Sequence, residues 1–270
     1  MTRLLFIGDI VGRPGREILT RGLGAIVSAH DIHCVIVNVE NAAAGFGVTP
    51  EIANEILDLG VHVMTGGNHT FDKKEIAPYF AQESRLLRPA NLPAGAPGAG
   101  HYVARASNGV NVGVVNVMGR VFMTPIDDPF RVVLTEIERV KKDAAIVFVD
   151  FHAEATSEKV AMGWHLDGKA TVMVGTHTHV QTADERVLPQ GTAYITDVGM
   201  TGPHDGVIGV DRHAIVTKFL SGLPQRFETA RDNPRINGVI VDADEKTGKA
   251  LAITRLSLSA KDVDALVARQ

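Results

Sequence analysis

Five short apolar runs in this sequence end in side chains that can bind a metal ion. The endings are Gly8-Asp9, Val39-Glu40-Asn41, Gly67-Asn68-His69, Asp150-Phe151-His152 and Gly175-Thr176-His177-Thr178-His179. Such runs are shorter than helices usually are, and they are typical of buried strands. The carboxyl ends of parallel strands meet at one edge of a sheet. The pattern therefore predicts an α/β fold with its polar endings gathered at that edge.

The segments between the first runs have helical patterns. Residues 16–29 carry an apolar face, and Thr49-Pro50 is typical of an N-cap followed by proline at the first helical position, opening a helix through Leu59. Further helices are expected at 131–142, 157–164 and about 211–221. The resulting alternation of strands and helices predicts parallel strands joined by helical crossovers.

Two hairpins are expected as well. Residues 102–106 and 110–117 flank Asn108-Gly109, which predicts a type I′ turn and antiparallel strands, and 239–242 pair with 250–258. No repeat, low-complexity segment or long linker divides the chain, so residues 1–270 are expected to form a single domain. The exposed hairpin at 102–117 is a weak argument for a homo-oligomer.

Composition excludes several classes of function. The net charge of −4 argues against a protein that binds duplex nucleic acid, although a nucleotide or a short oligonucleotide in a cleft remains compatible with it. Cys34 is the single cysteine, so neither a disulfide within the chain nor a cluster of thiolate ligands is available. The first apolar run is too short for a signal sequence or a membrane span, which favours a cytoplasmic protein without membrane contact.

The polar endings predict a metal site. Without thiolates, their imidazole, carboxylate and amide groups favour manganese, iron, zinc or magnesium. They are too many for one tetrahedral ion with an open position, but they suit two ions that share a carboxylate, for which Glu40 is the natural choice. Any one of these groups alone would more often be structural. The candidate ligands are Asp9, Glu40, Asn41, Asn68, His152, His177 and His179.

The order and spacing of these residues resemble the calcineurin-like metallophosphoesterases, whose motifs run GD-x-H, GD-x-x-D, GNH, H and GH-x-H. Two departures from that pattern, Val11 in place of the first-motif histidine and Glu40-Asn41 in place of the second-motif aspartate, are similar to the YmdB-like branch. That branch consists of bacterial phosphodiesterases acting on cyclic nucleotides. The resemblance implies a four-layer αββα sandwich of two mixed β-sheets.

The resemblance also implies a ligand set and a catalytic residue. The metals would be iron or manganese, with zinc or magnesium as the alternatives, and His69 matches the catalytic histidine of the family. By the same resemblance, the first ion is held by Asp9, Glu40, Asn41 and His179, and the second by Glu40, Asn68, His152 and His177.

The resemblance implies hydrolysis of a small phosphodiester, with 2′,3′-cyclic AMP as the leading substrate. A metal-bridging hydroxide attacks phosphorus, and His69 gives a proton to the leaving 2′ oxygen, so that a 3′-nucleotide remains. Two alternatives stay open from the sequence: a phosphomonoesterase or nucleotidase with the same metals, and a regulatory scaffold whose metal site is structural. His69 argues against the scaffold, which would need no proton donor.

Overall fold

The first apolar runs of the chain form parallel strands of one mixed sheet. In this computed structural model, which describes residues 1–269, β1 (Thr2–Ile7), β2 (Cys34–Asn38) and β3 (Val63–Thr65) are parallel. The long strand β11 (Pro234–Ala243) runs antiparallel to β1 and pairs on its other side with β12 (Ala250–Ser259). The two-residue strand β10 (Gly202–Pro203) completes this first sheet.

The second sheet has a parallel centre and antiparallel edges. Its central strands are β5 (Asn111–Met118), β6 (Ile146–His152), β7 (Val172–Thr176) and β9 (Ala193–Ile195). Antiparallel strands β4 (His101–Arg105) and β8 (Arg186–Val187) lie at the two edges. The predicted crossovers and both predicted hairpins are therefore confirmed.

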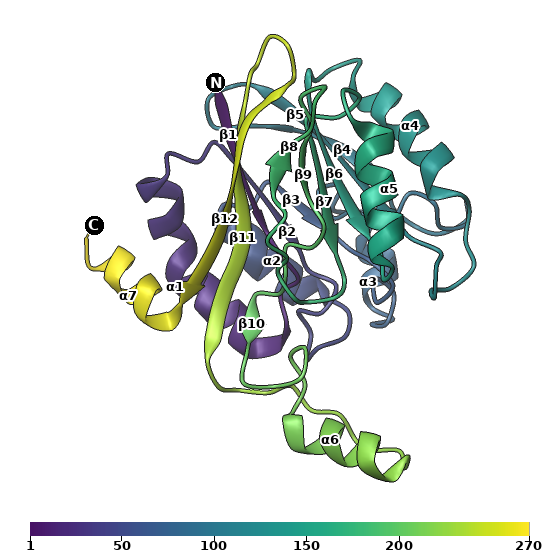
Figure 1. The fold of residues 1–270 in the computed structure, drawn as a ribbon, viewed down its shortest axis with the longest axis vertical. Coiled ribbons are helices and arrows are strands. Elements are labelled where there is room, and N and C mark those ends of the chain that lie inside the picture. Colours follow the sequence, from purple (N-terminus) through teal and green to yellow (C-terminus); the bar gives the residue numbers. More distant parts are fainter. Residues whose placement is uncertain (270) are drawn as a thin grey trace.

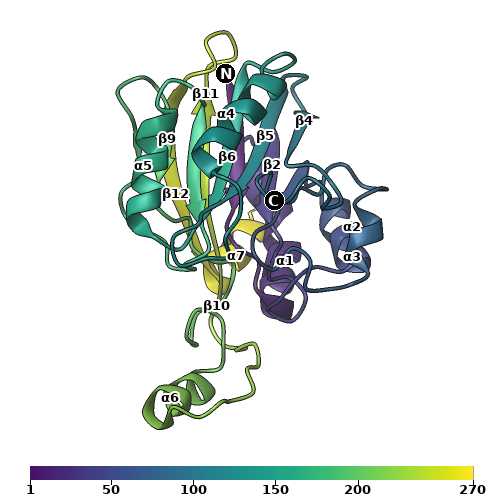
Figure 2. The same ribbon diagram turned by 90° about the vertical axis from the view of Figure 1, so that its right-hand side faces the viewer.

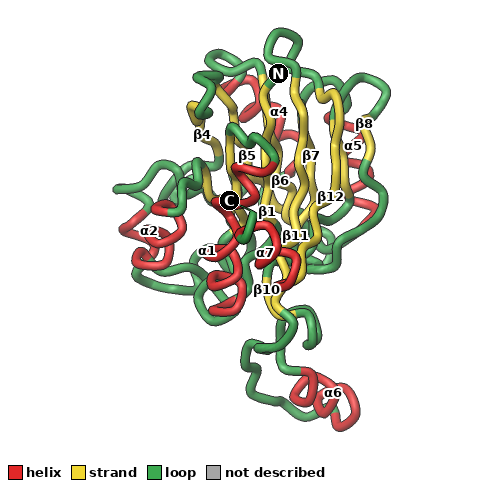
Figure 3. The backbone as a smooth tube through the Cα atoms, turned by 90° about the vertical axis from the view of Figure 1, so that its left-hand side faces the viewer, coloured by secondary structure: helices red, strands yellow, loops and turns green. Residues whose placement is uncertain are grey.

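Helices cover the outer face of each sheet (Figures 1 and 2). On the first sheet lie α1 (Gly12–Ala29), α2 (Pro50–Asp58), α3 (Ile76–Tyr79) and α7 (Ala260–Val267), whose apolar side chains share one buried cluster with those of β1 and β2. On the second sheet lie α4 (Pro129–Val140) and α5 (Thr156–Leu166). Figure 3 shows α1 and α7 in front of the first sheet.

Strand alternation explains why the two sheets pack against each other. Leu5 and Ile7 of β1 face the helices, whereas Leu4 and Phe6 face the second sheet. The ring of Phe6 meets that of Phe148, with centroids 5.1 Å apart. An apolar cluster fills each of the three spaces between layers. The expected four-layer sandwich of two mixed sheets is confirmed.

Two local predictions were wrong. Helix α1 begins at Gly12 rather than at residue 16, because Pro14 lies in the first turn, where its missing N–H costs no hydrogen bond. The turn at Asn108-Gly109 is not type I′, since only Gly109 has a positive φ (85°) and its N–H donates to the carbonyl of Ala106. Such a turn places glycine at the left-handed position after an ordinary type I turn.

Helix α6 (Arg212–Ser221) projects from the sandwich on a loop that leaves β10 and returns to β11 (Figures 1 and 2). Asp211 caps it by accepting hydrogen bonds from the N–H groups of His213 and Ala214. Its Phe219 and Leu220 side chains are exposed. Within residues 1–269, none of the helices has the length and apolarity that crossing a bilayer requires.

Candidate metal centre

All the predicted site residues lie at or just beyond the carboxyl ends of strands, as the sequence pattern requires. Asp9 follows β1, and Glu40 and Asn41 follow β2. From the second sheet, His152 ends β6 and His177 follows β7. Since the two sheets pack face to face, their strand ends converge on one edge of the sandwich, which is where ligand sites of α/β sheets are found.

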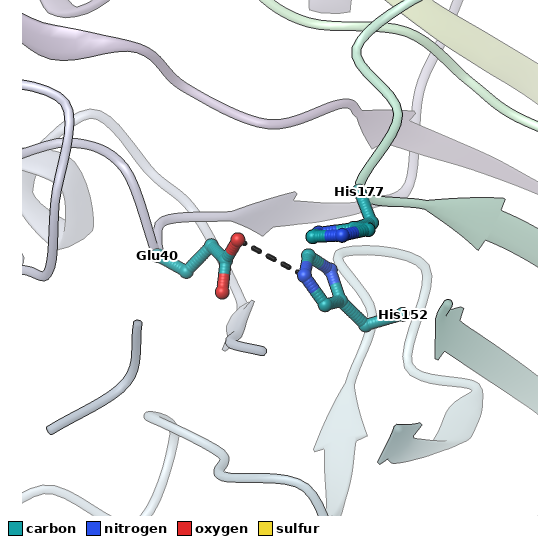
Figure 4. A group of neighbouring side chains, drawn as sticks. All are labelled: Glu40, His152 and His177. Carbon is teal, nitrogen blue, oxygen red and sulfur yellow. Dashed lines mark ion pairs between the residues drawn. The ribbon is translucent and has the colours of Figure 1, made fainter. Parts of the chain in front are cut away.

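Glu40, His152 and His177 form the tightest group of donors (Figure 4). One potential ligand atom from each lies within 4.8 Å of the others, and the Glu40 Oε1 to His152 Nε2 distance is 3.0 Å. The rings of His152 and His177 meet edge to face with centroids 4.7 Å apart. A Cβ on Gly67 would lie 2.3 Å from His152 Cδ2 and 2.4 Å from Glu40 Oε2, so glycine leaves the room this group needs.

The hydrogen bonds of His152 show which of its nitrogens faces the centre. Nδ1 lies 2.9 Å from the hydroxyl of Thr176, which donates to Asp150 Oδ1 at 2.7 Å and therefore accepts from the imidazole. In its neutral form, with its proton on Nδ1, His152 directs the lone pair of Nε2 at Glu40 Oε1 and at Asn68 Oδ1, both 3.0 Å away. Three atoms that can only accept thus face one another, and this arrangement needs a proton or a cation between them.

The charges of the group also suit a cation. Burial opposes the charge of Glu40, but the attraction of His152 outweighs it and lowers the Glu40 pKa to about 2. Burial likewise opposes the charge of His152, yet the Glu40 carboxylate raises its pKa to about 9. Burial, followed by repulsion from His152, lowers the pKa of His177 to about 3. At neutral pH Glu40 is thus ionised and His177 is neutral, and a carboxylate and a neutral imidazole are both metal ligands.

A second set of donors lies around Asp9. The buried atoms Oδ1 of Asp9 and Oδ1 of Asn41 have no hydrogen-bond partner among the described residues. Asn41 is oriented by its Nδ2, which donates to the carbonyl of Gly45 at 2.9 Å. His179 Nδ1 donates to the carbonyl of Ile208 at 2.8 Å, which leaves Nε2 as the lone pair. Unpaired buried oxygens are costly, so these residues fit a cation that would accept their lone pairs.

The structure does not bring every predicted ligand into one close group. Asp9 Oδ1 is 3.9 Å from His152 Nδ1, and its Oδ2 accepts the N–H of His177 at 3.3 Å, so Asp9 borders the group. His179 lies outside the set whose ligand atoms are within 4.8 Å of one another. The donors are therefore arranged as one tight group with a looser one beside it.

The turn that carries the two histidines is held from below by a buried ion pair. His177 (φ 98°) and His179 (φ 65°) have positive φ, which is unfavourable for residues other than glycine. Asp197 Oδ2 accepts hydrogen bonds from both N–H and hydroxyl of the intervening Thr178. Lys159 Nζ is 2.6 Å from the same oxygen, and both charged side chains are 1% exposed. This clamp keeps a strained turn in place.

His69 lies at the rim of the centre. Its N–H donates to Glu40 Oε2 at 3.0 Å, and its Nδ1 is 2.7 Å from Asp72 Oδ2. The ring of Phe46 packs against it edge to face at 5.0 Å. Asp72 and Phe46 together fix the imidazole so that Nε2 points away from Asp72, and the side chain remains 27% exposed.

Sequence reasoning missed the residues that orient the ligands. Asp150 is two residues before His152 on β6, and this spacing, which places both on one face of a strand, was a usable signal. Asp72, three residues after His69, was another. Nothing in the sequence indicated Glu154, whose Oε2 is 3.0 Å from His177 Nε2 and leaves Nδ1 of that neutral ring as its lone pair. Lys159 and Asp197 are distant in sequence and gave no signal.

Known proteins resemble this chain along almost its whole length. A family model described as YmdB-like protein matches residues 5–256. The 2′,3′-cyclic-nucleotide 2′-phosphodiesterase of Bacillus subtilis (strain 168) is 48% identical over 257 residues, covering 95% of this chain and 97% of that protein. A putative phosphatase/phosphodiesterase of Mycoplasma pneumoniae is 36% identical over 257 residues, covering 92% of this chain and 90% of that protein.

Solved structures agree with the fold. A hypothetical protein from Thermus thermophilus superposes with a TM-score of 0.88 at 38% identity, over 96% of this chain and 99% of that chain. A novel phosphatase from Mycoplasma pneumoniae superposes with a TM-score of 0.89 at 34% identity, over 96% of this chain and 93% of that chain.

Proposed function

Because the chain belongs to the YmdB-like protein family, we propose that it is a metal-dependent phosphodiesterase that hydrolyses 2′,3′-cyclic nucleotides at the 2′ ester. The observation that carries the proposal is the buried Glu40 carboxylate facing Nε2 of His152, with neutral His177 beside it. Such a group supports metal-assisted hydrolysis. The whole-length similarity to a 2′,3′-cyclic-nucleotide 2′-phosphodiesterase supports the choice of substrate.

We propose that the centre holds two ions, iron or manganese. Glu40 would be shared, since it belongs to the close group with His152 and His177 and its charge also acts on Asp9 of the second set. His152, His177 and Asn68 would hold one ion with Glu40, and Asp9, Asn41 and His179 would hold the other with it. Two bound cations neutralise the phosphoryl oxygens and lower the pKa of a water molecule.

We assign the proton transfer to His69. The leaving 2′ oxygen needs a proton as its bond to phosphorus breaks, and imidazole gives protons readily near neutral pH. Asp72 holds Nδ1 of His69, so Nε2 is the nitrogen available to the substrate. The partial exposure of the ring suits this role, because a substrate arriving from solvent can reach it.

The decisive experiment is a substrate panel combined with metal analysis. Purified protein is assayed on 2′,3′-cyclic AMP, bis-p-nitrophenyl phosphate and p-nitrophenyl phosphate, and its metal content is measured by plasma mass spectrometry. We expect two ions per chain and preference for the cyclic diester. A preference for p-nitrophenyl phosphate would establish a phosphomonoesterase instead, and bound metal without any turnover would support a regulatory scaffold.

The variant His69→Ala tests the proton donor. We expect it to retain its metals and to lose about 100-fold or more in kcat, the usual contribution of a general acid. The matched control is His213→Ala, because His213 is an exposed histidine on the projecting helix α6. If His69→Ala keeps full activity, the assignment of the proton donor is wrong even where the substrate is right.

A further inference from the structure

A basic groove lies between helix α1 and the segment 226–231. Its volume is about 810 Å³, and Arg13 and Arg21 line it from the helix while Arg226 and Arg231 line it from the segment. Glu17 and Glu228 are the acidic side chains of its lining. The groove therefore carries more positive than negative charge on a chain whose net charge is −4.

A second hollow extends this groove, because the two share Arg13 and Ala44 in their linings. The extension adds Arg16 and Lys73 as cations and Glu75 as an acid. Together the linings hold six cationic and three acidic side chains, whereas the whole chain has 27 cationic and 31 acidic ones. The enrichment marks a surface that attracts a polyanion.

The groove borders the candidate metal centre. Ala44 belongs to the turn that starts at the ligand Asn41, and the carbonyl of Asn41 accepts the N–H of Gly12 at the start of α1. Thr229 covers this junction, since a Cβ on Gly12 would lie 2.8 Å from its Cγ2. At the other end, Lys73 directly follows Asp72, the partner of His69. The loops that carry Asn41 and His69 thus contribute Ala44 and Lys73 to the linings of the groove and its extension.

Arg13, Arg226 and Arg231 are available to a ligand, whereas Arg16 donates to the carbonyl of Ala42 at 2.5 Å and Arg21 lies 3.4 Å from Asp264. Arg13 forms an ion pair with Glu17 at 2.6 Å, and these side chains are 80% and 60% exposed. Arg226 forms one with Glu228 at 3.8 Å, and these side chains are 90% and 66% exposed. Exposed pairs of this kind contribute little free energy, so a phosphate can displace the carboxylate. Arg231 makes no ion pair within the described part of the chain.

We infer that the groove binds the upstream phosphates of single-stranded RNA whose 2′,3′-cyclic phosphate end enters the metal centre. The inference rests on the proposed function and names its substrate class. A free cyclic nucleotide carries one phosphate, which the centre itself takes, and leaves the groove without a ligand. An oligoribonucleotide places further phosphates beside the arginines, and its bases can stack on exposed Phe46 next to His69.

The reaction at the RNA end is the same hydrolysis. The oxygen of water forms a bond to phosphorus, the bond between phosphorus and O2′ breaks, and O2′ takes the proton. The product is RNA with a free 2′-hydroxyl and a 3′-phosphate. RNA cleavage by attack of a 2′-hydroxyl on the adjacent 3′ phosphodiester supplies this substrate, because that class of reaction leaves a 2′,3′-cyclic phosphate.

The test compares a pentaadenylate that ends in a 2′,3′-cyclic phosphate with 2′,3′-cyclic AMP. For three phosphates in the groove, log KM of the oligonucleotide should rise against log salt concentration with a slope of about 2, from the factor of about 0.7 per phosphate for single strands. For the mononucleotide the slope should stay below about 1 by the same rule.

Two variants locate the effect. In the double variant Arg13→Gln with Arg231→Gln, we expect KM for the oligonucleotide to rise about tenfold while KM for 2′,3′-cyclic AMP stays within about twofold. The control is Arg105→Gln, because Arg105 ends β4 opposite Asn111, at the far end of the sandwich from the centre. This control should leave KM unchanged for both substrates.

Three outcomes would overturn the inference. They are equal KM and salt dependence for the two substrates, equal losses for both substrates in the double variant, or binding of the oligonucleotide that the variant leaves unchanged. In each of these cases the natural protein still hydrolyses 2′,3′-cyclic AMP, so only the role of the groove is refuted. Failure to hydrolyse either substrate would instead refute the proposed function.

Discussion

Oγ1 of Thr176 lies 2.9 Å from Nδ1 of His152, beneath the candidate metal centre. The contact follows from strand register, because the two residues are direct neighbours on β7 and β6. Asp150, which accepts a hydrogen bond from the Thr176 hydroxyl, also accepts hydrogen bonds from Thr65 and Asn38 of the first sheet. The second sheet thus supplies the ligand, and both sheets orient it.

We expect Thr176→Val to weaken metal binding, because it removes the hydroxyl that keeps the proton of His152 on Nδ1 and the lone pair of Nε2 inward. The loss in Mn²⁺ affinity should be about tenfold to 100-fold, the usual effect of removing such a partner. Calorimetric titration of metal-free protein measures it. Thr176→Ser keeps the hydroxyl and should retain the affinity; if the valine and serine variants bind Mn²⁺ alike, Thr176 does not orient His152.

Gly67→Ala should disrupt the centre through volume alone. The added methyl group would lie 2.3 Å from His152 Cδ2 and 2.4 Å from Glu40 Oε2, so both side chains would have to move. We expect the metal content to fall below one ion per chain, as measured by plasma mass spectrometry. The matched control is Gly24→Ala in helix α1, where a Cβ meets no heavy atom within 4 Å. There the melting temperature should rise, because alanine favours a helix by about 1 kcal/mol over glycine.

Lys159→Met should destabilise the fold severely. It leaves Asp197 as a buried carboxylate without its cation, and losing one partner of a buried pair costs about 3–5 kcal/mol. Urea unfolding followed by circular dichroism measures this free energy. Arg255→Met breaks the more exposed pair with Glu185 and should cost less than about 1 kcal/mol. Equal losses for the two variants would contradict the role of Lys159 as a clamp.

Cys34 should make the stability of the protein fall at alkaline pH. Burial raises the pKa of its thiol to about 12, from an ordinary value of 9.0. Between these values the unfolded chain releases a proton that the folded chain keeps, so the free energy of unfolding decreases as pH rises. At about pH 10.5 the loss is about 2 kcal/mol, at 1.36 kcal/mol for each unit of pKa difference.

The variant Cys34→Ala tests this linkage. Its absolute stability will differ because the core is repacked, so the comparison is between slopes of the free energy of unfolding from neutral pH to about pH 10.5. We expect a shallower slope in the variant than in the natural protein. Parallel slopes would mean that another group causes the alkaline loss.

The sequence by itself determined which strands exist and which chemistry lies at their ends. Apolar runs that stop at Asp9, Glu40 and His152 predict both the buried strands and a shared edge, because strand periodicity and burial are local properties of the chain. The same logic predicted the cap at Thr49, whose hydroxyl accepts the N–H of Ile52. The sequence did not predict the turn type at Asn108-Gly109 correctly, because the choice between two turn types depends on the bulge that follows.

Only the tertiary structure decided how the ligands are oriented and what surrounds them. Asp150 meets Asn38 across the two sheets, Lys159 meets Asp197 across 38 residues, and Thr229 closes over Gly12. These contacts depend on how layers pack and on the register between strands, neither of which a local pattern specifies. Residue types could therefore predict a metal centre, whereas the proton positions, the clamp beneath it and the basic groove beside it are products of packing.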